Sequence, residues 1–89
     1  MSSCKVNIAS PLRSYTGGKS QVTAIGSTLQ EVLADLERQF PGMRFRMIDE
    51  QNRIREHIRL AINTDMTGDL QHCVRSGDVV HLLCALSGG

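Results

Sequence analysis

The sequence predicts an α+β fold, in which a mixed β-sheet packs on one main helix. Near the N-terminus apolar residues alternate with polar ones, which is the pattern of a strand with one buried face. One later segment has its apolar residues at helical spacing, and the most apolar run, residues 79–86, lies close to the C-terminus. Strands on both sides of a single amphipathic helix favour one sheet that buries its apolar face against that helix.

The first 25 residues predict a β-hairpin. Residues 4–8 alternate between apolar and polar side chains, which is the period of a half-buried strand. Pro11 ends regular pairing because it lacks a backbone N–H group. Turn residues follow at 15–19, and residues 21–25 then form the returning strand.

The main helix is predicted to begin after Thr28 and to end before Pro41-Gly42. Thr28 and Glu31 fit a capping box, in which each side chain accepts a hydrogen bond from a backbone N–H group that the helix leaves unpaired. Five apolar residues at helical spacing give the helix one apolar face: Leu29, Val32, Leu33, Leu36 and Phe40.

The segment between this helix and the final strand predicts several short elements. The expected order is a helical turn at 43–48, a polar turn within 49–55, a strand at 58–62, a turn at 63–65, and a short segment of ambiguous type at 70–74. Gly77-Asp78 then introduces the last strand. That strand is apolar on both faces, as expected for a central strand covered by a helix, and its period of two places Leu82 on the core face and Leu83 on the outer face.

Length and composition indicate a single small domain and limit its functions. The chain has 89 residues and a net charge of +1, so no strong field attracts nucleic acid or an anionic membrane. One Tyr, two Phe and no Trp offer few platforms for stacking bases. Neither a membrane-spanning run nor a signal peptide is recognisable, and three cysteines without paired spacing predict reduced thiols in a cytoplasmic protein.

The chain ends in Ser87-Gly88-Gly89 directly after its most apolar run. Residues without a Cβ atom pass through a narrow channel that any side chain would block. They also present a bare α-carboxylate as the reactive group. A C-terminal Gly-Gly is therefore a chemical handle that another protein's active site could receive.

The order of elements and several short motifs resemble the MoaD/ThiS family of sulfur carriers, which share the ubiquitin-like β-grasp fold. Similar residues occur in the same order at Pro11-Leu12-Arg13, Tyr15-Thr16-Gly17-Gly18, Gly26-Ser27-Thr28-Leu29, Phe40-Pro41-Gly42, Asn63, Gly77-Asp78 and Gly88-Gly89. The Thr16-Gly17-Gly18 turn resembles the branch that supplies sulfide for cysteine or secondary metabolites. Cys84 departs from the family, because many members carry Pro there.

The resemblance implies a single β-grasp domain over residues 1–89 with a flexible tail at 86–89, and a carrier rather than an enzyme. A MoeB/ThiF-like adenylyltransferase would use ATP to adenylate the carboxylate of Gly89, and a sulfur donor would convert it to a thiocarboxylate. A downstream biosynthetic enzyme would then accept the sulfur. The chain itself would bind no cofactor and no metal, and would contribute no catalytic residue.

The resemblance also implies the residues that contact the activating enzyme. In the tail these are Leu86, Ser87 and Gly88. On the outer face of the sheet, Ala9, Leu83 and Met66 match positions where family members expose apolar side chains, and Arg13 matches a position that contacts the partner.

Other interpretations of the sequence remain open. Cys4, Cys73 or Cys84 could be a nucleophile, although no activating base accompanies them in sequence. His72, Cys73, His81 and Cys84 match no standard zinc spacing, and His81 is instead predicted to be a partly covered residue on the outer face of the sheet. The arginines between residues 44 and 59 are interleaved with acids and predict a solvated mixed-charge face rather than a nucleic-acid site. A ubiquitin-like modifier conjugated to lysines, or a β-grasp binding module with passive glycines, are the alternative functions.

Overall fold

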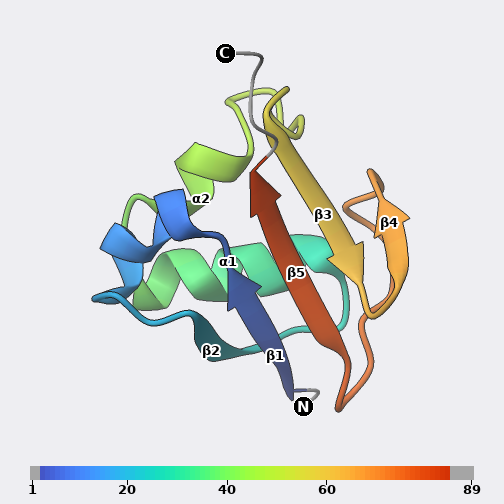
Figure 1. Ribbon diagram of the computed structural model, residues 1–89. Coiled ribbons are helices and arrows are strands. Elements are labelled where there is room, and N and C mark those ends of the chain that lie inside the picture. The colour runs from blue at the N-terminus through green and yellow to red at the C-terminus, as the bar shows by residue number, and fades with distance from the viewer. Residues whose placement is uncertain (1–2, 85–89) are drawn as a thin grey trace.

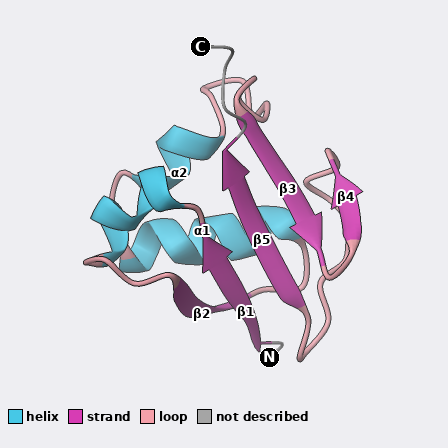
Figure 2. Ribbon diagram, in the orientation of Figure 1, coloured by secondary structure: helices cyan, strands magenta, loops and turns pink. Residues whose placement is uncertain are grey.

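The computed structural model describes residues 3–84 as a five-stranded mixed sheet with its main helix on one face (Figure 1). The elements are β1 (Ser3–Ile8), the 3-10 helix η1 (Ser10–Thr16), β2 (Gln21–Ile25), α1 (Leu29–Gln39), α2 (Met43–Met47), β3 (Ile58–Ile62), β4 (Asp65–Thr67) and β5 (Val79–Cys84). The helix α1 crosses behind the sheet in Figure 2. This is the α+β fold that the sequence predicts, in the β-grasp arrangement that the family resemblance implies.

The last strand, β5, lies at the centre of the sheet, as its two apolar faces predict. The strand order is β2-β1-β5-β3-β4, with β5 parallel to β1 and antiparallel to β3. Val80 and Leu82 are fully buried on the helix side, where they join the core together with β1 and β3. Since β5 has a neighbour on each side, its last residue, Cys84, is held beside the start of β3, where it pairs with Ile58.

The helix α1 forms where the sequence predicts it, and its apolar stripe is core. Leu29, Val32, Leu33 and Leu36 are all completely buried. The backbone N–H of Glu31 donates to Thr28 Oγ1 at 3.2 Å, but the Glu31 carboxylate accepts from the backbone N–H of Ser27 at 2.7 Å, one residue before the predicted reciprocal partner. No helix in residues 3–84 is both long and apolar enough to cross a membrane.

The connection between β1 and β2 differs from the predicted turn. The two strands pair antiparallel over Ser3–Asn7 and Gln21–Ile25, so the predicted hairpin pairing is confirmed. Between them, however, the chain forms η1, because Pro11 supplies a φ angle suited to the first turn of a helix. The helix η1 ends where Gly17 adopts a left-handed φ of 66°, and Thr16 Oγ1 donates to the carbonyl of Lys19 at 2.8 Å.

The sequence did not predict β4, and the ambiguous segment at 70–74 is not a regular element. Asn63 adopts a left-handed φ of 56°, so the chain turns tightly and Asp65 pairs back to Ile62. The segment that follows is anchored by its buried side chains, Leu70 and Val74. Its carbonyl groups also cap α1, because Leu29 N donates to His72 O at 3.1 Å and Gln30 N donates to Leu70 O at 2.9 Å.

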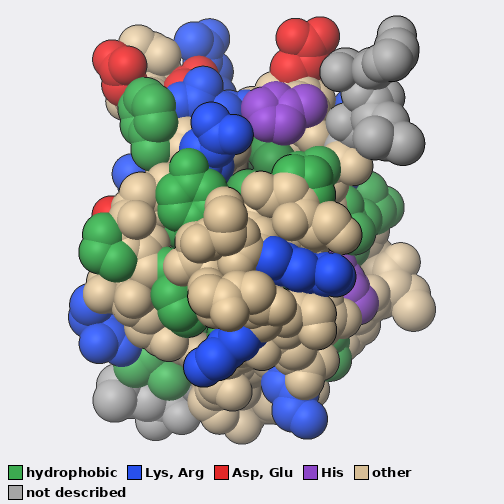
Figure 3. Space-filling model, turned by 60° about the vertical axis from the view of Figure 1, so that its left-hand side comes forward, with side chains coloured by type: hydrophobic (Ala, Val, Ile, Leu, Met, Phe, Trp, Pro, Cys, Tyr) green, Lys and Arg blue, Asp and Glu red, His purple; other side chains and the backbone are tan. Residues whose placement is uncertain are grey.

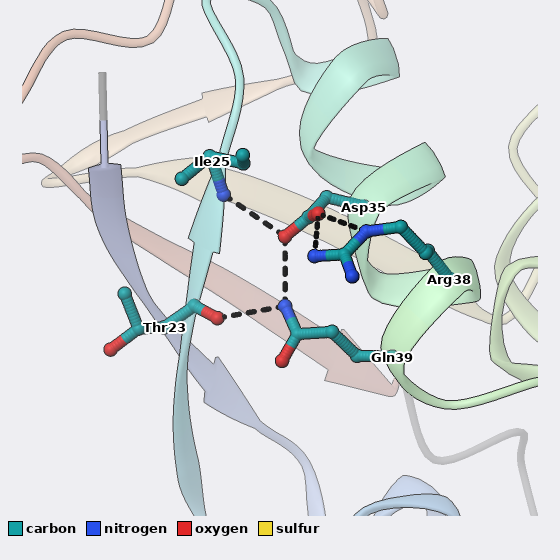
Figure 4. Close-up of polar contacts among 5 residues, drawn as sticks. All are labelled: Thr23, Ile25, Asp35, Arg38 and Gln39. Carbon is teal, nitrogen blue, oxygen red and sulfur yellow. Dashed lines mark hydrogen bonds and ion pairs between the residues drawn. The ribbon is translucent and has the colours of Figure 1, made fainter. Parts of the chain in front are cut away.

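A buried carboxylate joins α1 to the outer edge of β2 (Figure 4). Asp35 accepts hydrogen bonds from the backbone N–H of Ile25 at 3.1 Å, from the Arg38 guanidinium at 2.7 Å and from the Gln39 amide at 2.7 Å. Gln39 also donates to the carbonyl of Thr23 at 3.0 Å. Burial alone would raise the pKa of Asp35, but these hydrogen bonds hold it below its ordinary value. The helix thus occupies backbone groups of an edge strand that would otherwise be open to pairing.

Candidate functional site

The candidate site is the end of the sheet from which the C-terminal tail leaves. The predicted tail residues Leu86, Ser87, Gly88 and Gly89 lie outside the described residues, and the described part of the site is the base of this tail. Its base is Cys84, the last residue of β5, which pairs with Ile58 at the start of β3. The strand β1 runs parallel to β5 and ends at the same end of the sheet, since Ile8 pairs with Leu82. Figure 1 shows α2 at this end as well.

Three of the predicted partner contacts, Leu83, Ala9 and Arg13, come together at this end of the sheet. Leu83 is 40% exposed, whereas its neighbour Leu82 is completely buried, so the facing of the last strand is confirmed. The backbone N–H of Ala9 donates to the carbonyl of Leu82 at 3.1 Å, which holds Ala9 beside the end of β5. Arg13 Nε donates to the carbonyl of Ile8 at 2.9 Å, so its guanidinium is fixed at the end of β1.

Met66, the fourth predicted residue, lies on the same face but farther across the sheet. It belongs to β4, where it pairs with Ala61, and Ala61 pairs in turn with His81 of β5. Residues paired across strands project to the same face, so Met66 shares the outer face with His81 and Leu83. Met66 is 59% exposed, which makes it the most exposed large apolar side chain in residues 3–84. The outer face therefore carries two separate apolar contacts, one near the tail and one at the β4 edge.

Sequence reasoning missed a polar row in the middle of the outer face. The Gln21 amide donates to Asn7 Oδ1 at 2.7 Å, and Asn7 Nδ2 lies 3.1 Å from His81 Nδ1. The row crosses β2, β1 and β5. The period of each strand indicates that these side chains face outward, but the pairing that aligns them is not visible in the sequence. The prediction that His81 is a partly covered residue on the outer face is confirmed.

Sequence reasoning also missed an exposed aromatic side chain on α2. Phe45 is 55% exposed, and the guanidinium carbon of Arg55 lies 4.5 Å from the centre of its ring. Arg55 Nε also donates to the carbonyl of Phe45. This stacking fixes the polar loop that follows α2 against the helix. The helical turn predicted at residues 43–48 is confirmed, but the sequence pattern did not indicate that the ring of Phe45 would be exposed.

The arginines between residues 44 and 59 form a mixed-charge surface, as predicted. Arg53 pairs with Asp49 at 3.4 Å, Arg44 donates to Asn52 at 3.0 Å, and Arg59 donates to the carbonyl of Glu56 at 2.6 Å. Figure 3 shows acidic side chains gathered mainly at the upper end of the molecule, with Lys and Arg side chains among them and below them. Because these guanidinium groups already have acceptors within the protein, they do not form a row of unpaired cations for a phosphate backbone.

Cys4, Cys73 and Cys84 are free thiols, and a nucleophilic cysteine requires surroundings that lower its pKa. Burial raises the pKa of the Cys4 thiol, and nearby Asp78 and Asp35 raise it further. Burial also raises the pKa of Cys84, against a smaller opposing effect of Arg46. Both thiols are therefore protonated at neutral pH. Among residues 3–84 no group of three or more His, Cys, Asp or Glu side chains has an arrangement suited to a metal ion.

Comparison with protein families and known proteins identifies the relatives of the chain. Residues 6–89 match the model of the ThiS family. The sulfur carrier protein CysO of Mycobacterium tuberculosis is 33% identical over 89 residues, which cover 94% of this chain and 96% of the relative. The family match extends from β1 through both C-terminal glycines.

Solved structures show the same fold. A chain in the crystal structure of the Amycolatopsis orientalis BexX/CysO complex superposes with a TM-score of 0.89 at 31% identity, covering 97% of this chain and 99% of that one. The small archaeal modifier protein 1 from Methanosarcina acetivorans superposes with a TM-score of 0.82 at 22% identity, covering 100% of this chain and 98% of that one. At 22% identity the second likeness concerns the fold alone, so it does not favour a modifier function.

Proposed function

Because the chain belongs to the ThiS family, we propose that it is a sulfur carrier whose sulfur is borne on the carboxyl group of Gly89. The observation that carries the proposal is the Gly88-Gly89 end in a chain that matches the family to its last residue. The relative at 33% identity is itself named a sulfur carrier protein. The chain is a substrate of its partners, and we place it in the cytoplasm, where free thiols such as its cysteines persist.

The first step activates a group that is otherwise unreactive. A carboxylate is a poor electrophile, because its negative charge repels a nucleophile. One oxygen of the Gly89 carboxylate attacks the α-phosphorus of ATP, the bond to the β-phosphate oxygen breaks, and pyrophosphate leaves. The product is an acyl-adenylate with AMP as a good leaving group. A MoeB/ThiF-like adenylyltransferase binds the ATP and supplies the catalytic groups, so the carrier needs no cofactor of its own.

The second step stores the sulfur. A donor at the oxidation level of sulfide attacks the acyl carbon, AMP leaves with the electron pair of its bond to carbon, and Gly89 becomes a thiocarboxylate. Its sulfur is a nucleophile that stays attached to the protein until a biosynthetic enzyme presents an electrophilic acceptor. The thiocarboxylate sulfur displaces a leaving group from that acceptor, which gives a thioester between Gly89 and the acceptor. Water then cleaves the bond between the acyl carbon and sulfur, so the sulfur remains on the acceptor and the Gly89 carboxylate is regenerated.

The outer face of the sheet positions the tail in the adenylyltransferase. Leu83, Ala9 and Arg13 lie at the base of the tail, and exposed Met66 gives a second apolar contact on the same face. Contacts at two places on this one face define the orientation of the domain on the partner, while Leu86, Ser87 and Gly88 enter the channel. An apolar surface left open on a small domain is typical of a protein–protein contact.

Intact-mass measurement tests the modification. The chain is incubated with its adenylyltransferase, ATP and a sulfide donor, and its mass should rise by the difference between a sulfur and an oxygen atom. A variant that lacks Gly89 should gain nothing, because its last residue no longer reaches the reacting phosphate. A mass gain that survives the deletion contradicts the assignment of Gly89.

Gly88→Val tests the channel without touching the reacting residue. Residue 88 follows Cys84, the last residue of β5, by four positions in the sequence, so we expect a side chain there to leave the core intact but to obstruct a narrow passage. The melting temperature should be unchanged while adenylation falls by at least about tenfold, equivalent to about 1.4 kcal/mol. A Gly88→Val variant that is activated at the normal rate rules out a channel with that restriction.

Conjugation in the native host separates a carrier from a protein modifier. A tagged chain is recovered under denaturing, reducing conditions, and the carrier function predicts that it returns unconjugated. Abundant species of higher mass that contain an isopeptide bond from Gly89 to a lysine, and that vanish in the Gly89 deletion, would establish the modifier instead.

A further inference from the structure

The outer face of the sheet has one sign of charge. Lys5 on β1 and Arg59 on β3 are exposed, and they pair with the outward residues Val79 and Leu83 of β5. Asp65 is the one acidic residue within the described strands, and it pairs with Ile62, whose side chain is buried in the core. Asp65 therefore projects to the helix side of the sheet. The outward positions of the strands thus carry positive charges only.

The hydrogen bonds of the polar row formed by Gln21, Asn7 and His81 run in a defined direction. Asn7 Oδ1 accepts the hydrogen bond from Gln21, so the Asn7 NH₂ group is the one that faces His81 Nδ1. An amide NH₂ group only donates, and Nδ1 must then be the nitrogen with the lone pair. A neutral imidazole carries a single N–H group, which this arrangement places on Nε2. None of the hydrogen bonds among residues 3–84 uses His81 Nε2.

The surroundings of His81 leave this donor available at the middle of the face. Its cross-strand neighbours are Asn7 on β1 and Ala61 on β3, and Ala61 has a side chain too small to cover the imidazole ring. Beyond Ala61 lies exposed Met66, and the next outward residue of β5 after His81 is exposed Leu83. A hydrogen-bond donor of fixed direction therefore stands between the two apolar contacts.

We propose that this face docks an acidic surface of the adenylyltransferase, and that His81 Nε2–H selects a partner presenting a carboxylate or carbonyl oxygen opposite it. The inference rests on the proposed function and specifies its partner. Complementary charge brings the two proteins together and excludes wrong partners, while a donor that must be satisfied on burial sets the register of the complex. Asn7 and Gln21 are positioning residues, because they act by fixing the tautomer of His81.

Two substitutions of His81 separate a directional donor from a merely apolar contact. The amide nitrogen of Gln reaches the place of Nε2, so His81→Gln should keep the KM for the carrier within about threefold of wild type. His81→Leu has no donor and should raise that KM about tenfold with kcat unchanged, the change expected for about one hydrogen bond. If the KM of the His81→Leu variant equals that of wild type or is lower, His81 does not donate a hydrogen bond to the partner and the inference is wrong.

The charge of the face is tested with the two lysines of the chain. Lys5→Glu should raise the KM several-fold in low salt, because it reverses a charge on the docking face, and the effect should shrink as salt screens it. Lys19→Glu makes the same change in the connection before β2 and should alter the KM less than twofold. If Lys5→Glu and Lys19→Glu change the KM equally, the outer face does not dock an acidic surface of the partner.

The tautomer is measured without any partner, so this test stays decisive if the proposed function is wrong. The nitrogen chemical shifts of His81 at alkaline pH should show a protonated Nε2 and an unprotonated Nδ1. Asn7→Leu removes the hydrogen bond to His81 Nδ1, so both nitrogen chemical shifts of His81 should move toward those of a mixture of tautomers. A proton on Nδ1 in the wild-type chain overturns the inference. A wild-type chain that never gains sulfur contradicts the proposed function instead.

Discussion

The two faces of β5 differ sharply although they alternate along six residues. On the helix side Leu82 is completely buried among core residues, whereas Leu83, the next residue, is 40% exposed on the outer side. Both residues are leucine, so the difference comes from what covers each face. The helix α1 covers one side, and none of the elements within residues 3–84 covers the other (Figure 1). One strand thus stabilises the domain with one face and offers the other for recognition.

Polar groups on the two sides of the sheet are used in the same contrasting way. On the helix side, Asp35 is buried and accepts hydrogen bonds from Ile25, Arg38 and Gln39. On the outer side, the row from Gln21 through Asn7 ends at His81, whose Nε2 makes no hydrogen bond within the described residues. A polar group satisfied within the chain contributes to folding, and one left available contributes to binding.

The largest expected effect is that of a charge placed on the core face. Leu82→Glu should lower the free energy of unfolding by more than about 4 kcal/mol, because a carboxylate in the core has no partner. Urea denaturation followed by circular dichroism measures the loss. Leu83→Glu is the matched control and should cost less than about 1 kcal/mol in stability. If Leu83→Glu unfolds the domain and Leu82→Glu does not, the two faces have been assigned the wrong way round.

Binding should show the opposite order. Leu83→Glu should weaken association with the adenylyltransferase by about 2 kcal/mol, or about thirtyfold, since it places an acid in an apolar contact on a face that docks an acidic surface. Titration calorimetry with the purified partner measures the change, and Leu83→Met serves as the conservative control. Wild-type affinity of the Leu83→Glu variant would mean that the outer face does not contact the partner.

The smallest expected effect concerns Asp35 and depends on pH. Its pKa is lowered in the folded state, so its stabilising contribution is present above the unfolded value of 3.8 and disappears as pH falls through the lower folded value. Asp35→Asn should therefore cost about 1–2 kcal/mol at pH 7, and the gap to wild type should narrow toward pH 2. Urea denaturation at several pH values measures the difference in stability between wild type and Asp35→Asn. The other carboxylates titrate alike in the two proteins, so their contributions cancel in this difference. A gap that is independent of pH would show that the charge of Asp35 does not contribute.

Local patterns were sufficient to predict most elements of the fold. The alternation in β1 and β5, the helical spacing from Leu29 to Leu36, and the capping residue Thr28 all appear in the structure as expected. These features depend on neighbours a few residues apart, which the sequence displays directly. The same alternation correctly separated buried Leu82 from exposed Leu83.

What the sequence determined by itself was the set of elements, the buried face of each, and the Gly88-Gly89 handle that carries the functional proposal. Tertiary structure alone decided which strands pair. Only the register of β1 against β5 brings Asn7 to His81, 74 residues apart in the chain, and only the fold places Asp35 against the edge of β2. The short strand β4 and the helix η1 were missed because turns at Asn63 and Pro11 allow several continuations. Contacts with distant segments select among them, and no local pattern records such contacts.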